Sequence, residues 1–281
     1  MVGKGTLLQD KLQRFQQRGQ FQDLKVVVTC LDGTQADFRC HRVILAALSS
    51  TLENKLRDLG VGDTLNIRIK TKDPWIFRNV IRSAYGFKPS FYTVPEAMGA
   101  HILAKQLGCL PLARTSGNFV LARVRPNTIW PLLDMALDKS PIQRKALKVL
   151  TEETTLCLWD SGFLGCSRRA LELLVAAPEL QVREVDLVER VVSWANEMNG
   201  GQRLTPEVAK DVLGAVVIGG LRLLTLTADE FGASVAKAGL LDSEALLAVL
   251  VNIHSPGQLP MPDGLSQSKE HRAEVKKEEE A

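Results

Sequence analysis

The residues that could carry nucleophilic chemistry in this chain are the adjacent pair Cys40-His41 and four further cysteines, Cys30, Cys109, Cys157 and Cys166. A histidine can take the proton of a neighbouring thiol and leave a thiolate nucleophile, which is the chemistry that such a pair suggests. Adjacent residues at the start of a helix point in different directions, however, so they rarely form a nucleophile–base pair. We therefore expect no catalytic residue: Cys40 is predicted to be a small buried residue, and His41 to hold a structural position through hydrogen bonds.

The histidines and cysteines also lack the spacing of a metal site. No Cys-x-x-Cys occurs and no two histidines have ligand spacing, so we expect neither a metal nor another cofactor. His101 lies on a predicted helix among Ala100, Ile102 and Leu103, which favours a hydrogen-bonded core histidine. The cysteines lie in apolar stretches, as reduced and buried thiols of a cytoplasmic or nuclear protein do.

Composition excludes several partners. The 281 residues are 45% hydrophobic and 24% charged, which are ordinary globular values, and the length has room for two domains. A formal net charge of +3 is too small to indicate nucleic acid binding. The longest apolar stretch, residues 212–224, is interrupted by glycines and by Arg222, so we expect no membrane partner.

The elements around Cys40-His41 form an α+β pattern. Residues 25–29 are strand-like, and Asp32-Gly33 then predicts a tight hairpin turn because glycine accepts a positive φ. A helical pattern follows from Cys40, and residues 65–70 alternate as a half-buried strand does. Ahead of the hairpin, residues 6–18 predict a helix with an apolar stripe formed by Leu7, Leu8, Leu12 and Phe15. That stripe must pack on its own domain or on a partner.

From Asn118 onwards the strand-like alternation disappears, and successive helices are predicted as far as Ile253. One of them begins at the capping box Thr227-Ala228-Asp229-Glu230. Residues 254–281 are rich in proline and glycine and then almost wholly charged. Such a segment buries too little apolar area to offset its ordering entropy, so we expect a disordered tail.

The order of these motifs resembles the BTB (POZ) domain, an interaction module. The specific part is the string His41-Arg42-x-x-Leu45-Ala46-Ala47-x-Ser49, preceded by Phe21-x-Asp23 and followed by Ile67-x-Ile69, Phe77 and Tyr85. Residues 1–19 then correspond to an N-terminal dimerisation helix and residues 20–115 to the BTB domain.

Residues 116–253 resemble the all-α BACK domain that follows BTB in many adaptors. The similar positions include Phe163-Leu164, the apolar residues between Leu180 and Val188, and Val191-Val192-x-Trp194. No Kelch repeats follow. The expected fold is therefore an α+β BTB/POZ domain followed by an all-α BACK helical domain.

The resemblance implies a substrate adaptor of a cullin-based E3 ubiquitin ligase, which bridges the cullin and an unknown protein substrate and forms a homodimer. In this family a hydrophobic-x-Glu motif contacts the cullin, and its closest match here is Val61-Gly62-Asp63. The implied cullin-binding residues are Val61, Asp63, Leu52 and Leu56. The implied dimer interface consists of Leu7, Leu8, Leu12 and Phe15, and Asp23, His41 and Trp194 are expected to be structural. The alternative is a non-catalytic BTB scaffold of a transcriptional or cytoskeletal assembly that does not bind a cullin.

Overall fold

A computed structural model describes residues 4–60, 62–71 and 73–272, with side chains from residue 7 onwards. The chain folds into two units, Met1–Arg123 and Val124–Ala281. Sequence analysis placed the boundary between the domains at 115/116, but helix α6 (Leu110–Leu121) runs through that position without a break. The division between the two units therefore lies beyond the end of this helix.

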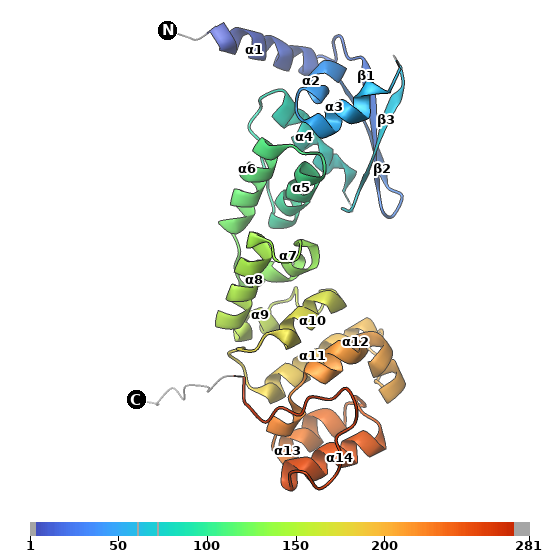
Figure 1. The fold of residues 1–281 in the computed structure, drawn as a ribbon, viewed down its shortest axis with the longest axis vertical. Helices are drawn as coiled ribbons and strands as arrows, with labels where there is room; N and C mark the ends of the chain where they lie inside the picture. Colours follow the sequence, from blue (N-terminus) through green and yellow to red (C-terminus); the bar gives the residue numbers. More distant parts are fainter. Residues whose placement is uncertain (1–3, 61, 72, 273–281) are drawn as a thin grey trace, which may run out of the picture. The chain divides into compact units, whose positions relative to one another are not determined.

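The first unit contains a three-stranded sheet of β1 (Leu24–Cys30), β2 (Gln35–Cys40) and β3 (Thr64–Ile69), in the order β2-β1-β3 (Figure 1). Strand β1 pairs antiparallel with β2 and parallel with β3, so that Val26 lies opposite both Phe38 and Leu65. Side chains along each strand alternate between buried and exposed positions, as a sheet covered on one face requires. The structure confirms the predicted hairpin, and Gly33 in its turn has a φ of 85°.

Helices pack on the buried face of this sheet, and several begin at a polar side chain that caps the first turn. Ser49, Asp73 and Thr93 each accept a hydrogen bond from a backbone N–H two or three residues further on. Besides α6, the helices of this unit are α1 (Lys4–Gln17), α2 (Arg42–Ala46), α3 (Ser50–Arg57), η1 (Pro74–Ile76), α4 (Phe77–Ala84) and α5 (Val94–Gln106).

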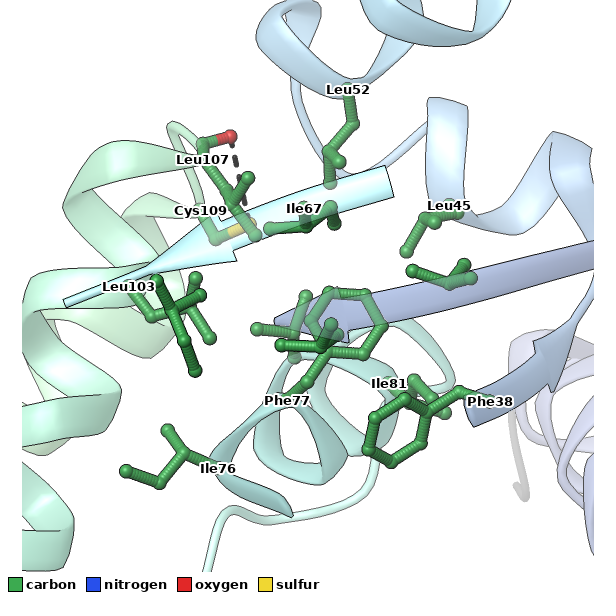
Figure 2. Packing of buried hydrophobic residues seen from close by; sticks show 14 of the residues in the cluster. Phe38, Leu45, Leu52, Ile67, Ile76, Phe77, Ile81, Leu103, Leu107 and Cys109 are labelled. Atoms are coloured by element: carbon green, nitrogen blue, oxygen red, sulfur yellow. Dashed lines mark hydrogen bonds between the residues drawn. The ribbon is translucent and has the colours of Figure 1, made fainter. Parts of the chain in front are cut away.

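The core of the first unit lies between the sheet and these helices. Figure 2 shows Phe77 at its centre, with Leu45 and Leu52 pointing into it from α2 and α3 and Leu103 from α5. All four of these side chains are at most 1% exposed. Burying each such side chain contributes about 1.5–3 kcal/mol to stability, so α2 and α3 are fixed firmly on the sheet.

The regular elements of the second unit, over the described residues, are all helices. The sequence predicted successive helices here, and the capping box at Thr227 and Glu230 is confirmed. Helix α12 has an internal break at Gly214, whose φ of 75° is not helical. The elements are η2 (Pro126–Thr128), α7 (Ile129–Met135), α8 (Pro141–Glu152), α9 (Thr154–Trp159), α10 (Arg168–Ala176), α11 (Glu184–Met198), α12 (Pro206–Gly220), η3 (Leu223–Thr225), α13 (Ala228–Phe231), η4 (Gly232–Ala236) and α14 (Ser243–His254).

The structure corrects the prediction that residues 254–281 form a disordered tail. Residues 255–272 pack on the helices of the second unit. Near the start of this segment, Asn252 Nδ2 donates to the Leu259 carbonyl at 2.8 Å. At its end, Arg272 is only 6% exposed. The guanidinium of Arg272 pairs with Glu184 and with three backbone carbonyls. Composition could not reveal this anchor, because it depends on one arginine whose acidic partner is 88 residues away. The rest of the predicted tail, residues 273–281, lies outside the described residues.

Candidate protein-interaction site

Asp23 and Arg42 together position the loop that precedes β3. The Asp23 carboxylate accepts a hydrogen bond from the backbone N–H of Arg42 at 2.7 Å, which fixes the start of α2 beside the start of β1. The Arg42 guanidinium then donates to the backbone carbonyls of Leu59 and Gly60. The Phe-x-Asp and His-Arg motifs, 19 residues apart in sequence, therefore act together to hold the loop between α3 and β3.

Within that loop, the Asp63 carboxylate accepts a hydrogen bond from the Gly60 N–H at 2.6 Å. The Asp63 residue is exposed. Val61, the apolar member of the predicted Val61-Gly62-Asp63 contact, lies outside the described residues. On the two sides of Val61, Arg42 thus holds Leu59 and Gly60, and Asp63 is bonded to Gly60.

The other two residues of the predicted cullin contact are buried within their own unit. Leu52 is 0% and Leu56 is 3% exposed, and Figure 2 shows Leu52 pointing from α3 toward Ile67. We therefore correct this part of the prediction, because side chains that complete the core offer no surface to a partner. Helical periodicity places residues three or four apart on one face, so the exposed face of α3 carries Glu53, Asn54, Lys55 and Arg57.

His41 links three elements through hydrogen bonds. Its backbone N–H donates to the Tyr85 hydroxyl at 3.0 Å, and its ring nitrogens meet that hydroxyl and the Gln20 carbonyl at 2.5 Å and 2.8 Å. Because a carbonyl can only accept, Nε2 carries the proton in the neutral ring and Nδ1 accepts from Tyr85. The end of β2 is thereby joined to the end of α4 and to the chain after α1.

This arrangement leaves no base for the Cys40 thiol, since both ring nitrogens of His41 have other partners. Burial, with a smaller contribution from the Asp23 carboxylate, raises the pKa of Cys40 to about 12, so the group remains a thiol at neutral pH. Burial also raises the pKa of Tyr85 to about 12, which keeps its hydroxyl proton available for His41. Cys40 and His41 therefore stabilise the fold and do not form a nucleophilic site.

His101 has a similar structural position. Its Nδ1 lies 2.8 Å from the Ala113 carbonyl and must donate to it, and burial lowers the pKa of the ring. Gly117 fits against this ring, because a Cβ there would lie 3.0 Å from His101 Cε1. The histidine thus connects α5 to α6.

The apolar stripe of α1 is divided between two environments. Leu12 packs against the core of the first unit, and Phe15 meets Phe21 edge to face with ring centres 5.1 Å apart. Leu7 and Leu8, in contrast, are 65% and 64% exposed. Leu12 and Phe15 of the predicted dimer interface thus pack α1 on its own domain. Leu7 and Leu8 remain exposed to solvent.

Two glutamines, which sequence reasoning missed, hold α1 in place. Gln9 and Gln13 donate from their amide groups to the carbonyls of Gly86 and Tyr85, both at 3.0 Å. Gly86 has a φ of 74°, and a Cβ there would lie 2.1 Å from Gln9 Nε2, so the turn after Tyr85 needs a glycine. The only signal in the sequence is that Gln9 and Gln13 are four residues apart, which is too common a pattern to identify a contact.

In the second unit, Trp194 is 3% exposed and its indole N–H donates to the Cys166 carbonyl at 3.0 Å. The neighbours expected on its helical face, Leu187, Val188 and Val191, are all 0% exposed. The side chain therefore both fills the core and connects α11 to the loop before α10.

Over the part of the chain that the structure describes, no three His, Cys, Asp or Glu side chains gather in a way that could hold a metal ion. Among the same residues, no helix has the length and apolar character needed to cross a bilayer. The five cysteines are buried and unpaired with one another. Two features are candidates for protein interaction: the residues on either side of Val61 before β3, and the exposed Leu7 and Leu8 of α1.

Comparison with known proteins identifies the first unit. Residues 12–104 match the family model of the BTB/POZ domain. BTB/POZ domain-containing protein 6 of Homo sapiens is 25% identical over 137 residues, which are 47% of this chain and 25% of the relative. BTB/POZ domain-containing protein 3 of Homo sapiens is 24% identical over 224 residues, which are 78% of this chain and 42% of the relative.

The chain thus spans about a quarter of the first of these relatives and about two fifths of the second. Among solved structures, the BTB domain of zebrafish PATZ1 is 24% identical and matches with a TM-score of 0.32, covering 43% of this chain and 94% of that chain.

Proposed function

Because residues 12–104 form a BTB/POZ domain, a module through which proteins bind one another, we propose that this protein is a substrate adaptor of a cullin-based E3 ubiquitin ligase. In this proposal the first unit binds the cullin and dimerises, as BTB domains typically do. The second unit is a BACK domain that extends the cullin surface. The protein itself carries out no chemistry and acts in the cytoplasm or the nucleus.

The observation that carries the proposal is the set of hydrogen bonds on either side of Val61, between α3 and β3. Arg42 donates to the carbonyls of Leu59 and Gly60, and Asp63 accepts from the Gly60 N–H. Residues that are already held in place lose less entropy on binding than free ones, so these flanking residues suit a recognition surface. The exposed face of α3 lies directly before it in the chain and completes the proposed contact.

The mechanism is proximity. An adaptor that holds a substrate and a cullin at the same time raises the effective concentration of substrate lysines at the ubiquitin-loaded enzyme. No catalytic group in this chain is needed for that effect. Dimerisation doubles the number of binding sites in one assembly and adds avidity.

Calorimetry with a purified cullin N-terminal domain tests the proposal. Wild type should bind, and Val61→Ala should weaken binding roughly thirtyfold if Val61 is an interface anchor, because a hot-spot truncation costs about 2 kcal/mol or more. Asp63→Ala should have a smaller effect, since exposed polar pairs contribute only about 0–1 kcal/mol. Lys55→Glu probes the exposed face of α3.

Leu31→Ala is the matched control, because Leu31 is 79% exposed at the far end of the hairpin. Its affinity should equal that of wild type. If wild type binds and neither Val61→Ala nor Lys55→Glu weakens the complex, the cullin surface lies elsewhere. If wild type does not bind at all, the adaptor proposal fails.

The second candidate is a dimeric BTB scaffold that recruits partners without a cullin. The hydrogen bond from the Gly60 N–H to Asp63 favours it, because one carboxylate oxygen of the proposed contact is already used within the loop. Affinity purification from cells with mass spectrometry separates the two candidates: recovery of a cullin supports the adaptor, and partners without a cullin support the scaffold.

A further inference from the structure

We propose that a groove formed by α1, β2 and α4 of the BTB unit binds an acidic peptide segment of a partner protein. We call it the arginine groove, and it is defined by Arg39, Arg78, Arg82, Trp75 and Phe87 together with Asp37. It uses none of the residues of the loop before β3. The proposal therefore stands whether or not the protein binds a cullin.

The groove is large enough to take several side chains. Its cavity volume is about 510 Å³, within the range of sites that hold small ligands or short peptide segments. One wall is the end of α1, which contributes Gln16 and Gln17, and the opposite walls come from β2 and from η1 and α4. All of these elements belong to one unit, so the groove is complete within a single chain.

The charge in the groove is predominantly positive. Three guanidinium groups line it, from Arg39, Arg78 and Arg82, against the single carboxylate of Asp37. That carboxylate is already matched by Lys25, whose Nζ lies 2.7 Å away. Within the described part of the chain, none of the three arginines takes part in an ion pair at hydrogen-bonding distance.

Aromatic rings hold two of these guanidinium groups in place. Arg78 Cζ lies 4.1 Å from the ring centre of Trp75, and Arg82 Cζ lies 5.3 Å from that of Phe87. Trp75 is itself fixed by an edge-to-face contact with Phe38 at 5.5 Å, although it remains 47% exposed. A stacked guanidinium is oriented before a ligand arrives. Arg82 Nη2 also donates to the Lys88 carbonyl at 3.3 Å, and a guanidinium has five N–H donors, so others remain for a carboxylate.

The chemistry of the groove favours an acidic peptide that also carries an apolar side chain. Arginine forms two parallel hydrogen bonds with a carboxylate, and the exposed face of Trp75 offers apolar contact beside them. Nucleic acid fits less well, because the whole chain has a net charge of only +3 and the described basic residues of the groove are few. We therefore assign the groove to an acidic, partly apolar segment of a protein.

Fluorescence anisotropy with the full-length protein tests this assignment. The probe is a fluorescein-labelled peptide of about twelve residues, in which Asp or Glu alternates with Leu and Phe. It should bind saturably, with an affinity that falls as salt rises. The double variant Arg39→Gln/Arg78→Gln should weaken binding at least tenfold, and Trp75→Ala should weaken it as well. Arg39 and Arg78 are exposed, so these variants should fold normally.

The matched control is Arg114→Gln on α6, an exposed arginine of the same unit that does not line the arginine groove. It should change the affinity by less than about twofold, since a single exposed charge outside the groove is largely screened at physiological salt. A labelled oligonucleotide of about twelve nucleotides is the second probe, and it should bind more weakly than the peptide.

Three results would overturn the proposal. The first is no saturable binding of the acidic peptide at about millimolar concentration. The second is an equal loss of affinity in Arg114→Gln and in the groove variant, which would indicate nonspecific attraction. The third is tighter binding of the oligonucleotide with the same dependence on Arg39 and Arg78, which would assign the groove to nucleic acid.

Discussion

Arg272 Nε donates to Glu184 Oε2 at 2.9 Å, and the two side chains are only 2% and 4% exposed. The same guanidinium donates to the carbonyls of Val175, Ala177 and Gly220. Because Arg272 lies at the end of the segment that follows α14, this cluster fixes residues 255–272 to the ends of α10 and α12 and to the start of α11. The segment is therefore part of the folded structure.

We predict that Arg272→Met lowers the free energy of unfolding by about 3–5 kcal/mol, because it leaves the Glu184 carboxylate buried without its charge partner. Thermal denaturation of the full chain measures this loss. The double variant Arg272→Met/Glu184→Gln should recover part of the stability, since it removes both charges. Lys210→Met is the control: Lys210 pairs with Asp242 at 3.5 Å on the surface, and exposed pairs contribute only about 0–1 kcal/mol. Equal melting temperatures for Arg272→Met and wild type would contradict the structural role of the pair.

We expect Trp194→Ala to lower the stability of the second unit by about 3–5 kcal/mol, the usual loss for a large core side chain. Trp194→Phe should retain most of the apolar contact but leave the Cys166 carbonyl without its donor. That variant should lose about 1–3 kcal/mol. Chemical denaturation should show that Trp194→Ala loses more stability than Trp194→Phe. An unchanged midpoint for Trp194→Ala would show that the side chain is exposed in solution.

The pattern of the sequence could predict the elements whose signals are local. The Asp32-Gly33 turn, the alternation in residues 65–70 and the capping box at Thr227 each depend on neighbouring residues, and the corresponding elements are present. The distant contacts could not be predicted in this way. Asp23 with Arg42, Gln13 with Tyr85 and Arg272 with Glu184 join residues 19, 72 and 88 positions apart.

Helical periodicity also could not show which face of α3 packs against the core. It placed Leu52 and Leu56 on one face but could not show whether that face meets the core or a partner. In the structure it meets the core. The same ambiguity applied to α1, where Leu12 packs inward while Leu7 remains exposed.

Stability should fall at alkaline pH because of the buried thiols. Burial is the main cause that raises the pKa of Cys40, Cys157 and Cys166 from 9.0 to about 12. In the unfolded chain these thiols lose their protons above pH 9, so the folded state binds more protons there and the free energy of unfolding decreases. The stabilisation that comes from keeping these buried thiols protonated is fully present below pH 9. It is lost as the pH rises from 9 to about 12.

Each thiol should reduce the free energy of unfolding by about 1.4 kcal/mol for each pH unit in this window. Urea denaturation at several pH values between 8 and 11 measures the slope. Cys40→Ala should give a shallower slope than wild type, whatever its effect on stability at neutral pH. Identical slopes for the two proteins would mean that the Cys40 thiol ionises as easily in the folded state as in the unfolded one.

The dimer interface should depend on the exposed part of α1. Burying Leu7 and Leu8 against a second copy would contribute about 1.5–3 kcal/mol each before ordering costs. The variant Leu7→Asp/Leu8→Asp should therefore be monomeric and keep the melting behaviour of a folded domain. Leu12→Asp, in contrast, should lower the melting temperature, because Leu12 packs against the core of its own unit. Sedimentation equilibrium, with Leu31→Asp as a surface control, distinguishes these outcomes.

The most direct test of the adaptor proposal is the mass of the complex that the full-length protein forms with a purified cullin N-terminal domain, measured by light scattering during gel filtration. A dimeric adaptor predicts one peak whose mass equals two copies of this chain and two cullin domains. With Leu7→Asp/Leu8→Asp, the same measurement should give a complex of one copy of each. Separate elution of the protein and the cullin domain at concentrations of about ten micromolar would contradict the proposal, because an adaptor must hold its cullin at least that tightly.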